Sequence, residues 1–409
     1  MNRKFYKKTV CYIGFSGIVF VFFSILSSLI NAAEDTQRDA VIRTVMGDNS
    51  AGQASSFSCK TNNGDKRIYG VKKYDVGAVN LAYVEGPDTG PALVILPGMS
   101  VPWQSYIKTA ELLCKHFHLF IVTQRGHDIT GWATDRAYHV SDYGRDVTRL
   151  IREVIKEPVI ISGHSLGGLV ALWVASTQQD IVIGFNAEDG AFLVNEKQRW
   201  QDSWVKALFV GLEQRLRAYH EQGASIEEVT HMFAESRLVL PSVHMSYERR
   251  IIGLGKTLSL NRHSGMPPLS TQDKPHIHAG YKKYLSGIAP RNSEFWPPAV
   301  LRAATIASLH LDPEVARASV TTELVAGFDN REAFAKVRAP MLYWESDREM
   351  VGVISPSDHS SLVATVRNNN IRAEHIYVEG SGHRIHFDRP EKFADEITRF
   401  FKQSRGLSI

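Results

Sequence analysis

A ten-residue stretch near the middle of the chain constrains the fold most. Residues 159–168 read Val-Ile-Ile-Ser-Gly-His-Ser-Leu-Gly-Gly, so a short apolar run ends abruptly in Gly-His-Ser-Leu-Gly. Apolar residues resume at once after Gly168 with the spacing of a helix. This arrangement predicts a buried strand, a sharp turn that carries Ser165, and a helix that begins at the turn.

The predicted turn explains why glycines surround the serine. If Ser165 projects above the sheet, the residues two before and two after it crowd one another, so Gly163 and Gly167 must be small. The N-terminus of the following helix would place backbone N–H groups and a partial positive charge beside the serine. We therefore expect Ser165 to be a nucleophile, and the alternative is a serine that only caps a helix.

Short apolar segments alternate with helical patterns on both sides of this stretch. Such alternation predicts an α/β fold, with a mostly parallel central sheet flanked by helices. Ligands of such sheets bind at the carboxyl ends of the strands. The expected strands are residues 77–83, 92–96, 119–123, 159–162, 181–186, 340–343 and 375–378. The expected helices are residues 103–115, 142–155, the segment from 165, 357–367 and 390–401.

The strand pattern stops between residues 191 and 330. Three amphipathic helices are expected there, at 200–219, 226–233 and 299–309. An insertion of about 140 residues is too long for a structureless loop, so we expect a helical cap. The core would then comprise residues 67–190 and 331–409. Residues 34–66 are polar and rich in Ser, Asn, Asp and Gly, which predicts an irregular leader.

The first 33 residues resemble an export signal. An almost wholly apolar segment, residues 10–30, follows a basic tip and precedes Ala32 and Ala33. A signal peptide cleaved after these small residues is our preferred interpretation, and a membrane anchor, which needs about 20 apolar residues, is the alternative. Both interpretations place the remaining chain outside the cytoplasm. A cleaved signal would leave it periplasmic or secreted, and an anchor would hold it at the membrane through residues 10–30.

Charge and cysteine content limit the partners. The net charge is +4 and the basic tip holds four positive residues, so the remainder is near neutral and predicts no nucleic-acid partner. Cys59 and Cys114 could form a disulfide in an exported chain, but spacing leaves their pairing open. No cofactor is expected because the glycines near Ser165 lack a phosphate-binding lysine. His276 and His278 lack a third ligand nearby, so no metal is expected.

Two other strand ends could complete a catalytic triad. His383 lies in a Gly-Ser-Gly-His loop after the strand at 375–378, and Asp347 lies just past the strand at 340–343. The chain order nucleophile, acid, histidine is the one expected for this scaffold. We expect His383 to act as general base and Asp347 to hold its other ring nitrogen. Three residues remain alternatives: Asp189 and Glu188 as the acid, and His386 as the histidine.

An oxyanion hole requires two preorganised N–H groups. Leu166, directly after the serine, should supply one of them. The loop at residues 97–100, after the strand at 92–96, should supply the other through the backbone of Met99.

These motifs together resemble the alpha/beta-hydrolase fold family. Residues 163–168 are similar to its nucleophile elbow, 380–383 to its histidine loop, 344–347 to its acid loop and 124–127 to its Arg-Gly-His segment. The resemblance covers roughly residues 67–190 and 330–402. It departs from the family at the oxyanion loop, where Pro97-Gly98 stands in place of His-Gly, and at Thr123 and Asp128, which flank the Arg-Gly-His segment.

The resemblance implies a serine hydrolase. A serine at 165, rather than an aspartate, argues against the dehalogenase and epoxide-hydrolase branches. We expect cleavage of a carboxylic ester in a small-molecule or lipid-like acyl substrate, through an acyl-enzyme on Ser165, with the cap shaping an apolar pocket. A lactone, thioester, amide or carbon–carbon bond is an alternative target, and a non-catalytic binding protein is the alternative class.

Overall fold

A nine-stranded sheet forms the centre of the molecule. The computed structural model describes residues 56–60, 66–190, 204–223, 225, 229–230, 298–346, 362, 364–365, 368, 372–379 and 381–404. The strand order is β1-β2-β3-β5-β4-β6-β7-β8-β9. The strands are β1 (Ser56–Lys60), β2 (Lys66–Asp75), β3 (Asn80–Glu85), β4 (Ala92–Leu96), β5 (His118–Thr123), β6 (Val159–His164), β7 (Val182–Glu188), β8 (Met341–Ser346) and β9 (Ala373–Val378).

The sheet is parallel where the predicted alternation occurs. Strands β4 to β9 pair in parallel, whereas β1, β2 and β3 pair in antiparallel fashion and β3 lies antiparallel to β5. The predicted α/β fold is therefore confirmed. The hairpin strand expected at residues 77–83 begins later, at Asn80, because the chain turns at Gly77, where φ is +94°.

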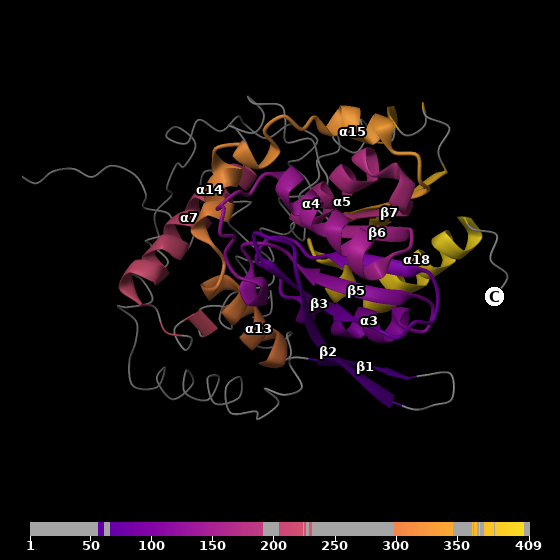
Figure 1. Cartoon of the computed structure of the whole chain (residues 1–409), viewed down its shortest axis with the longest axis horizontal. Helices are drawn as coiled ribbons and strands as arrows, with labels where there is room; N and C mark the ends of the chain where they lie inside the picture. Colours follow the sequence, from indigo (N-terminus) through magenta and orange to yellow (C-terminus); the bar gives the residue numbers. More distant parts are fainter. Residues whose placement is uncertain are drawn as a thin grey trace, which may run out of the picture.

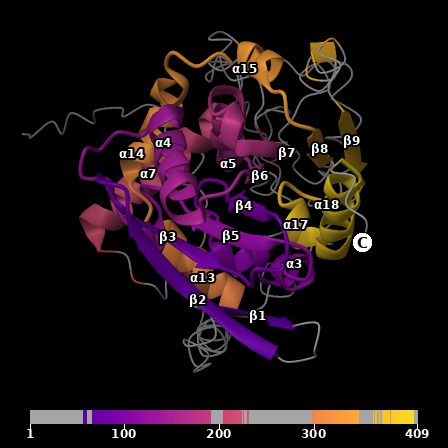
Figure 2. The same ribbon diagram turned by 45° about the vertical axis from the view of Figure 1, so that its right-hand side comes forward.

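Helices cover both faces of the sheet (Figures 1 and 2). One face carries α4 (Val140–Leu150), α5 (Leu166–Thr177) and α15 (Asn330–Lys336), whose buried residues share one core cluster. The other face carries α3 (Ile107–Leu113), α17 (Ile385–Asp388) and α18 (Pro390–Ser404), which belong to a second cluster. The sheet thus separates two cores, and the carboxyl ends of its parallel strands remain available for a site.

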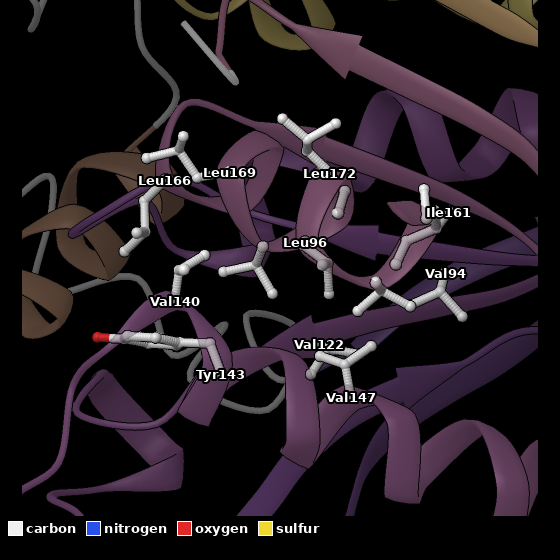
Figure 3. Close-up of a cluster of buried hydrophobic side chains, with 14 of the residues drawn as sticks. Val94, Leu96, Val122, Val140, Tyr143, Val147, Ile161, Leu166, Leu169 and Leu172 are labelled. Carbon is white, nitrogen blue, oxygen red and sulfur yellow. The ribbon is translucent and has the colours of Figure 1, made fainter. Parts of the chain in front are cut away.

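Helix α5 is buried along most of its length in the first core. Figure 3 shows Leu166 of α5 on the side of the helix toward Val140 of α4, whereas Leu169 and Leu172 lie on its other side. All four side chains belong to the first core cluster. Burying each such side chain stabilises the fold by about 1.5–3 kcal/mol relative to exposure. Because both ends of α5 are anchored in this core, its first residue, directly after Ser165, is held in a fixed place.

The first strand that the structure describes lies within the segment assigned to the leader. Strand β1 pairs with β2 in antiparallel fashion, and Phe57 and Cys59 of β1 are buried in the second core. Cys59 forms a disulfide with Cys114, which follows α3. The polar composition of residues 34–66 hid this strand, because its buried Phe57 and Cys59 alternate with half-buried serines.

The expected cap is described in part. Its helices are α7 (Trp204–Gln222), α13 (Pro298–Leu309) and α14 (Pro313–Val320), and the predicted helix at 226–233 falls mostly outside the described residues. Helix α14 packs on α7, whereas α15 packs on α5 of the core. None of the helices in the described ranges is long and apolar enough to cross a membrane, and residues 10–30 lie outside those ranges.

Candidate active site

Ser165 occupies a strained turn between β6 and α5. Its φ is +52° and its ψ is −117°, a backbone conformation that residues with a side chain rarely adopt. Hydrogen bonds on both sides hold this conformation. The Ser165 N–H donates to the carbonyl of Glu188 at 3.1 Å, and the Gly168 N–H donates to the carbonyl of Ser165 at 2.9 Å. The predicted strand, turn and helix are present.

The glycines around the serine are required by close backbone contacts. A Cβ atom on Gly163 would lie 2.0 Å from the carbonyl oxygen of Gly167, and one on Gly167 would lie 2.0 Å from that of Leu96. A Cβ atom on Gly98 would lie 2.9 Å from Cβ of Ser165. Separations this short exceed what side-chain adjustment can absorb. The steric interpretation of Gly163 and Gly167 is confirmed, and the loop after β4 reaches the serine.

The structure places both expected oxyanion donors beside the turn. Leu166 is the first residue of α5, and Met99 follows Gly98 in the loop that contacts Ser165. Within the described chain, neither N–H donates to a backbone carbonyl. The side-chain amide of Gln124 donates to the carbonyl of Pro97 at 2.7 Å and so fixes this loop.

The ring of His383 is oriented by a buried carboxylate. Its Nδ1 lies 2.6 Å from Oδ2 of Asp189, which directly follows β7. The hydroxyl of Ser346, at the end of β8, donates to the same Oδ2 at 2.6 Å. The Asp189 N–H donates to the carbonyl of Trp344 at 3.1 Å. The carboxylate is therefore held by two strands before it meets the histidine.

The hydrogen bond expected of Asp347 is made by Asp189. Asp347 lies outside the described residues, and Asp189 was the alternative acid. Strands β7 and β8 are parallel neighbours, so an acid after either strand could reach one histidine loop. Chain order cannot separate these two positions, because both lie between Ser165 and His383. Which acid contacts His383 therefore depends on the tertiary structure.

His383 lies beside the serine turn. The ring of His164, which precedes Ser165, is centred 4.4 Å from that of His383, and its Nε2 donates to the His383 carbonyl at 2.9 Å. The His383 side chain is 27% exposed, whereas Asp189 is fully buried. Both Ser165 and His383 are described, and no hydrogen bond joins Ser165 Oγ to the ring. Catalytic hydrogen bonds often tighten only when substrate binds.

A second carboxylate and histidine pair lies behind the first. Glu188 binds Nδ1 of His386 at 2.7 Å, and both side chains are almost completely buried. The Nε2 of His386 lies 3.1 Å from the hydroxyl of Ser105, which is also buried. His386 therefore has no access to a substrate, which argues against it as the catalytic histidine. Sequence reasoning considered Glu188 and His386 only as alternatives and missed that they bind one another.

Burial keeps His164 neutral. Burial, together with repulsion from His383 and His386, lowers the pKa of His164 well below its ordinary value. A neutral ring has one N–H, which it uses on the His383 carbonyl. Burial also lowers the pKa of Arg384 to about 10, so this guanidinium stays charged at neutral pH.

The described residues offer no ligand set for a metal. Among them, no group of three or more His, Cys, Asp or Glu side chains is placed to hold a metal ion. His276 and His278, which were considered as ligands, lie outside the described residues.

Curated relatives match only parts of the chain. A 2-(acetamidomethylene)succinate hydrolase of Mesorhizobium japonicum is 27% identical over 27% of this chain and 39% of that protein. A pimeloyl-[acyl-carrier protein] methyl ester esterase of Nitrosospira multiformis is 29% identical over 31% of this chain and 48% of that protein. The chain thus matches less than half of the length of these relatives.

The fold and a family match extend much further. The crystal structure of a membrane phospholipase A, described as a bacterial virulence factor, has a TM-score of 0.51 and 16% identity, with 95% of this chain and 98% of that one covered. At this identity the likeness shows the fold alone. The sequence matches the alpha/beta hydrolase family over residues 93–396, which is most of its length. The chain therefore belongs to the alpha/beta hydrolase family.

Proposed function

We propose that this protein is a serine hydrolase that cleaves a carboxylic ester through an acyl-enzyme on Ser165. The observation that carries the proposal is the Asp189–His383 pair, which lies beside a serine held in a strained strand-to-helix turn. Strain of this kind persists where the surrounding structure enforces it, and it is common at catalytic residues. The buried carboxylate would fix the histidine tautomer that leaves Nε2 free to take a proton.

The geometry supports a two-step reaction. The oxygen of Ser165 attacks the ester carbonyl carbon while His383 Nε2 takes its proton, and the N–H groups of Leu166 and Met99 stabilise the oxyanion. The imidazolium then protonates the departing alcohol, which leaves an acyl group on Ser165. A water molecule, deprotonated by His383, attacks this acyl group, and the acid departs as Ser165 regains its proton. Asp189 stabilises the imidazolium in both steps.

The ester class draws support from one relative. The Nitrosospira multiformis relative is named as a methyl ester esterase, whereas the Mesorhizobium japonicum relative is named as a hydrolase of 2-(acetamidomethylene)succinate. A triad of this kind serves several acyl bonds, so a lactone, thioester, amide or carbon–carbon bond is the alternative target. The pocket for the acyl group would be shaped by the cap.

We also propose that the hydrolase acts outside the cytoplasm. The Cys59–Cys114 disulfide supports export, because such bonds persist in oxidising compartments. Residues 10–30 would serve either as a cleaved signal or as the membrane anchor.

The test is labelling of the full chain with a serine-directed fluorophosphonate. Wild-type protein should be labelled, and Ser165→Ala and His383→Ala should not, because the reagent needs an activated serine. A panel of p-nitrophenyl esters of rising acyl length would then give the preferred chain length. Absence of labelling in folded wild-type protein would contradict the proposal and favour a binding protein on a hydrolase scaffold.

A further inference from the structure

Two consecutive carboxylates at the end of β7 hold two histidines that lie three positions apart. Asp189 binds the ring of His383, and Glu188 binds the ring of His386. The second pair is inaccessible to a substrate and so cannot take part in the reaction directly. It must have another role.

Glu188 contacts both the turn that carries Ser165 and the segment that follows His383. Its backbone carbonyl accepts the N–H of Ser165 at 3.1 Å. Its Oε1 accepts the backbone N–H of His386 at 2.8 Å, and the same oxygen lies 2.7 Å from Nδ1 of that residue. One residue therefore joins the nucleophile turn to the segment that carries the histidine.

His386 is held on every side. The ring of Tyr106 stacks on it with centroids 3.6 Å apart and an interplanar angle of 6°. Ser105 Oγ lies 3.1 Å from Nε2, and the hydroxyl of Thr109 donates to the His386 carbonyl at 2.6 Å. His386 is thus a fixed point on the face of the sheet covered by α3 and α17.

The fixed point lies close enough to control His383. Only two residues separate the histidines, and the second of them, Ile385, is fully buried and begins α17. His383 is itself held through its carbonyl by His164. A displacement of His386 would therefore move the backbone of His383 relative to Ser165. Displacements of about 1 Å in a catalytic group can cost about 100-fold in rate.

Stability alone does not account for this pair. Replacing two buried hydrogen-bonding partners by apolar groups of the same shape is often neutral or stabilising. We propose that Glu188 is a positioning residue, which acts through His386 to set the place of His383 relative to Ser165. This inference rests on the proposed function of Ser165 and His383.

The decisive variants are Glu188→Met and Glu188→Gln. Methionine has a similar length but no acceptor, whereas glutamine keeps an oxygen that can accept both hydrogen bonds from His386. We expect Glu188→Met to lower kcat on a p-nitrophenyl ester and the rate of fluorophosphonate labelling by about 10–100-fold, with KM within about twofold of wild type, as for other groups that orient a functional residue. Glu188→Gln should stay within about threefold of wild type, because the hydrogen-bond geometry is kept.

A double-mutant cycle tests whether Glu188 acts through His386. In the His386→Phe background, which keeps a ring against Tyr106, adding Glu188→Met should change kcat by less than about twofold. Ile397→Ala in α18 is the stability control, because this fully buried residue belongs to the second core, whereas Leu166 beside Ser165 belongs to the first. It should lower Tm but leave kcat per labelled site unchanged.

Each outcome decides the inference. A Glu188→Met protein that loses Tm but keeps wild-type kcat per labelled site would give Glu188 a purely structural role and overturn it. A Glu188→Gln protein as slow as Glu188→Met would assign the effect to charge and overturn positioning by hydrogen bonds. An undiminished effect in the His386→Phe background would also contradict it. Failure of the proposed function is distinct, because wild-type protein itself would then not be labelled.

Discussion

Oδ2 of Asp189 lies 2.6 Å from Nδ1 of His383, although 194 positions separate the two residues in the chain. Asp189 follows β7, while the histidine loop follows β9, so the loop must pass over the end of β8 to reach it. Ser346, at the end of β8, donates to the same oxygen. Three strand ends thus meet at one carboxylate, which makes it the structural centre of the proposed site.

We expect Asp189→Asn to lower kcat by about 10³–10⁴-fold, because an amide can stabilise the wrong ring tautomer and cannot stabilise the imidazolium. Steady-state hydrolysis of a p-nitrophenyl ester measures the change, and circular dichroism checks the fold. A larger loss in Asp347→Asn than in Asp189→Asn would return the acid to the position that the sequence favoured.

Ser346→Ala should have a smaller effect of the same kind. It removes one donor to Asp189 Oδ2 but leaves the carboxylate and its contact with His383. The loss of one hydrogen bond to a charged group, worth about 1.5–3 kcal/mol, corresponds to a decrease in kcat of at most about 100-fold. A loss equal to that of Asp189→Asn would contradict this ranking.

Gly163→Ala should destabilise the protein by about 3 kcal/mol or more, because its Cβ would meet the backbone of Gly167 and neither strand nor helix can yield. Gly327→Ala is the matched control. Its φ is +72° with open space around it, so only backbone strain of about 1–2 kcal/mol is expected. Urea unfolding of both variants measures the difference, and equal losses would refute the steric argument.

Replacing Cys59 and Cys114 together by alanine should lower the free energy of unfolding by about 4 kcal/mol. The bond links residues 55 positions apart, and closing a loop of this length restricts the unfolded chain by about that amount. Thermal unfolding should show a lower Tm, with kcat per labelled site unchanged because the disulfide joins β1 to the end of α3. Wild-type protein whose disulfide has been reduced should show a similar decrease in Tm. A double variant with the Tm of oxidised wild-type protein would contradict the prediction.

Acid should destabilise the protein through His127. Burial lowers its pKa to about 4, and its Nδ1 donates to the Arg125 carbonyl at 2.7 Å. The pKa of a histidine in the unfolded chain is about 6.5. Between about pH 6.5 and about pH 4 the unfolded chain therefore binds more protons than the folded protein, and the free energy of unfolding decreases as the pH is lowered. From pH 7 to pH 5 this histidine should cost about 2 kcal/mol.

The variant His127→Asn isolates this contribution. The free energy of unfolding of wild-type protein should fall by about 2 kcal/mol more than that of the variant over the same pH range. Parallel pH profiles for the two proteins would show that His127 does not titrate in this way.

The sequence predicted most of the parallel sheet. Strands were predicted at residues 92–96 and 159–162, within the observed β4 and β6, because apolar runs between turn residues leave few other interpretations. The sharp turn at Ser165 followed from its glycines. Strand β1 was missed because its sequence is mostly polar, and its contacts are made by the neighbouring β2 and by the disulfide to Cys114. The limits of helix α4, which continues as a π-helical turn at Ile151–Ile155, were close to those expected.

The local pattern by itself determined the serine turn, the histidine loop and the family, because each depends on residues that are neighbours in the chain. Only the tertiary structure decided which acid reaches His383, since β7 and β8 end side by side and both carry carboxylates. It also decided that Cys59 meets Cys114 and that Glu188 meets His386. Such contacts depend on which elements lie side by side in the fold, and the separation of two residues along the chain does not determine this.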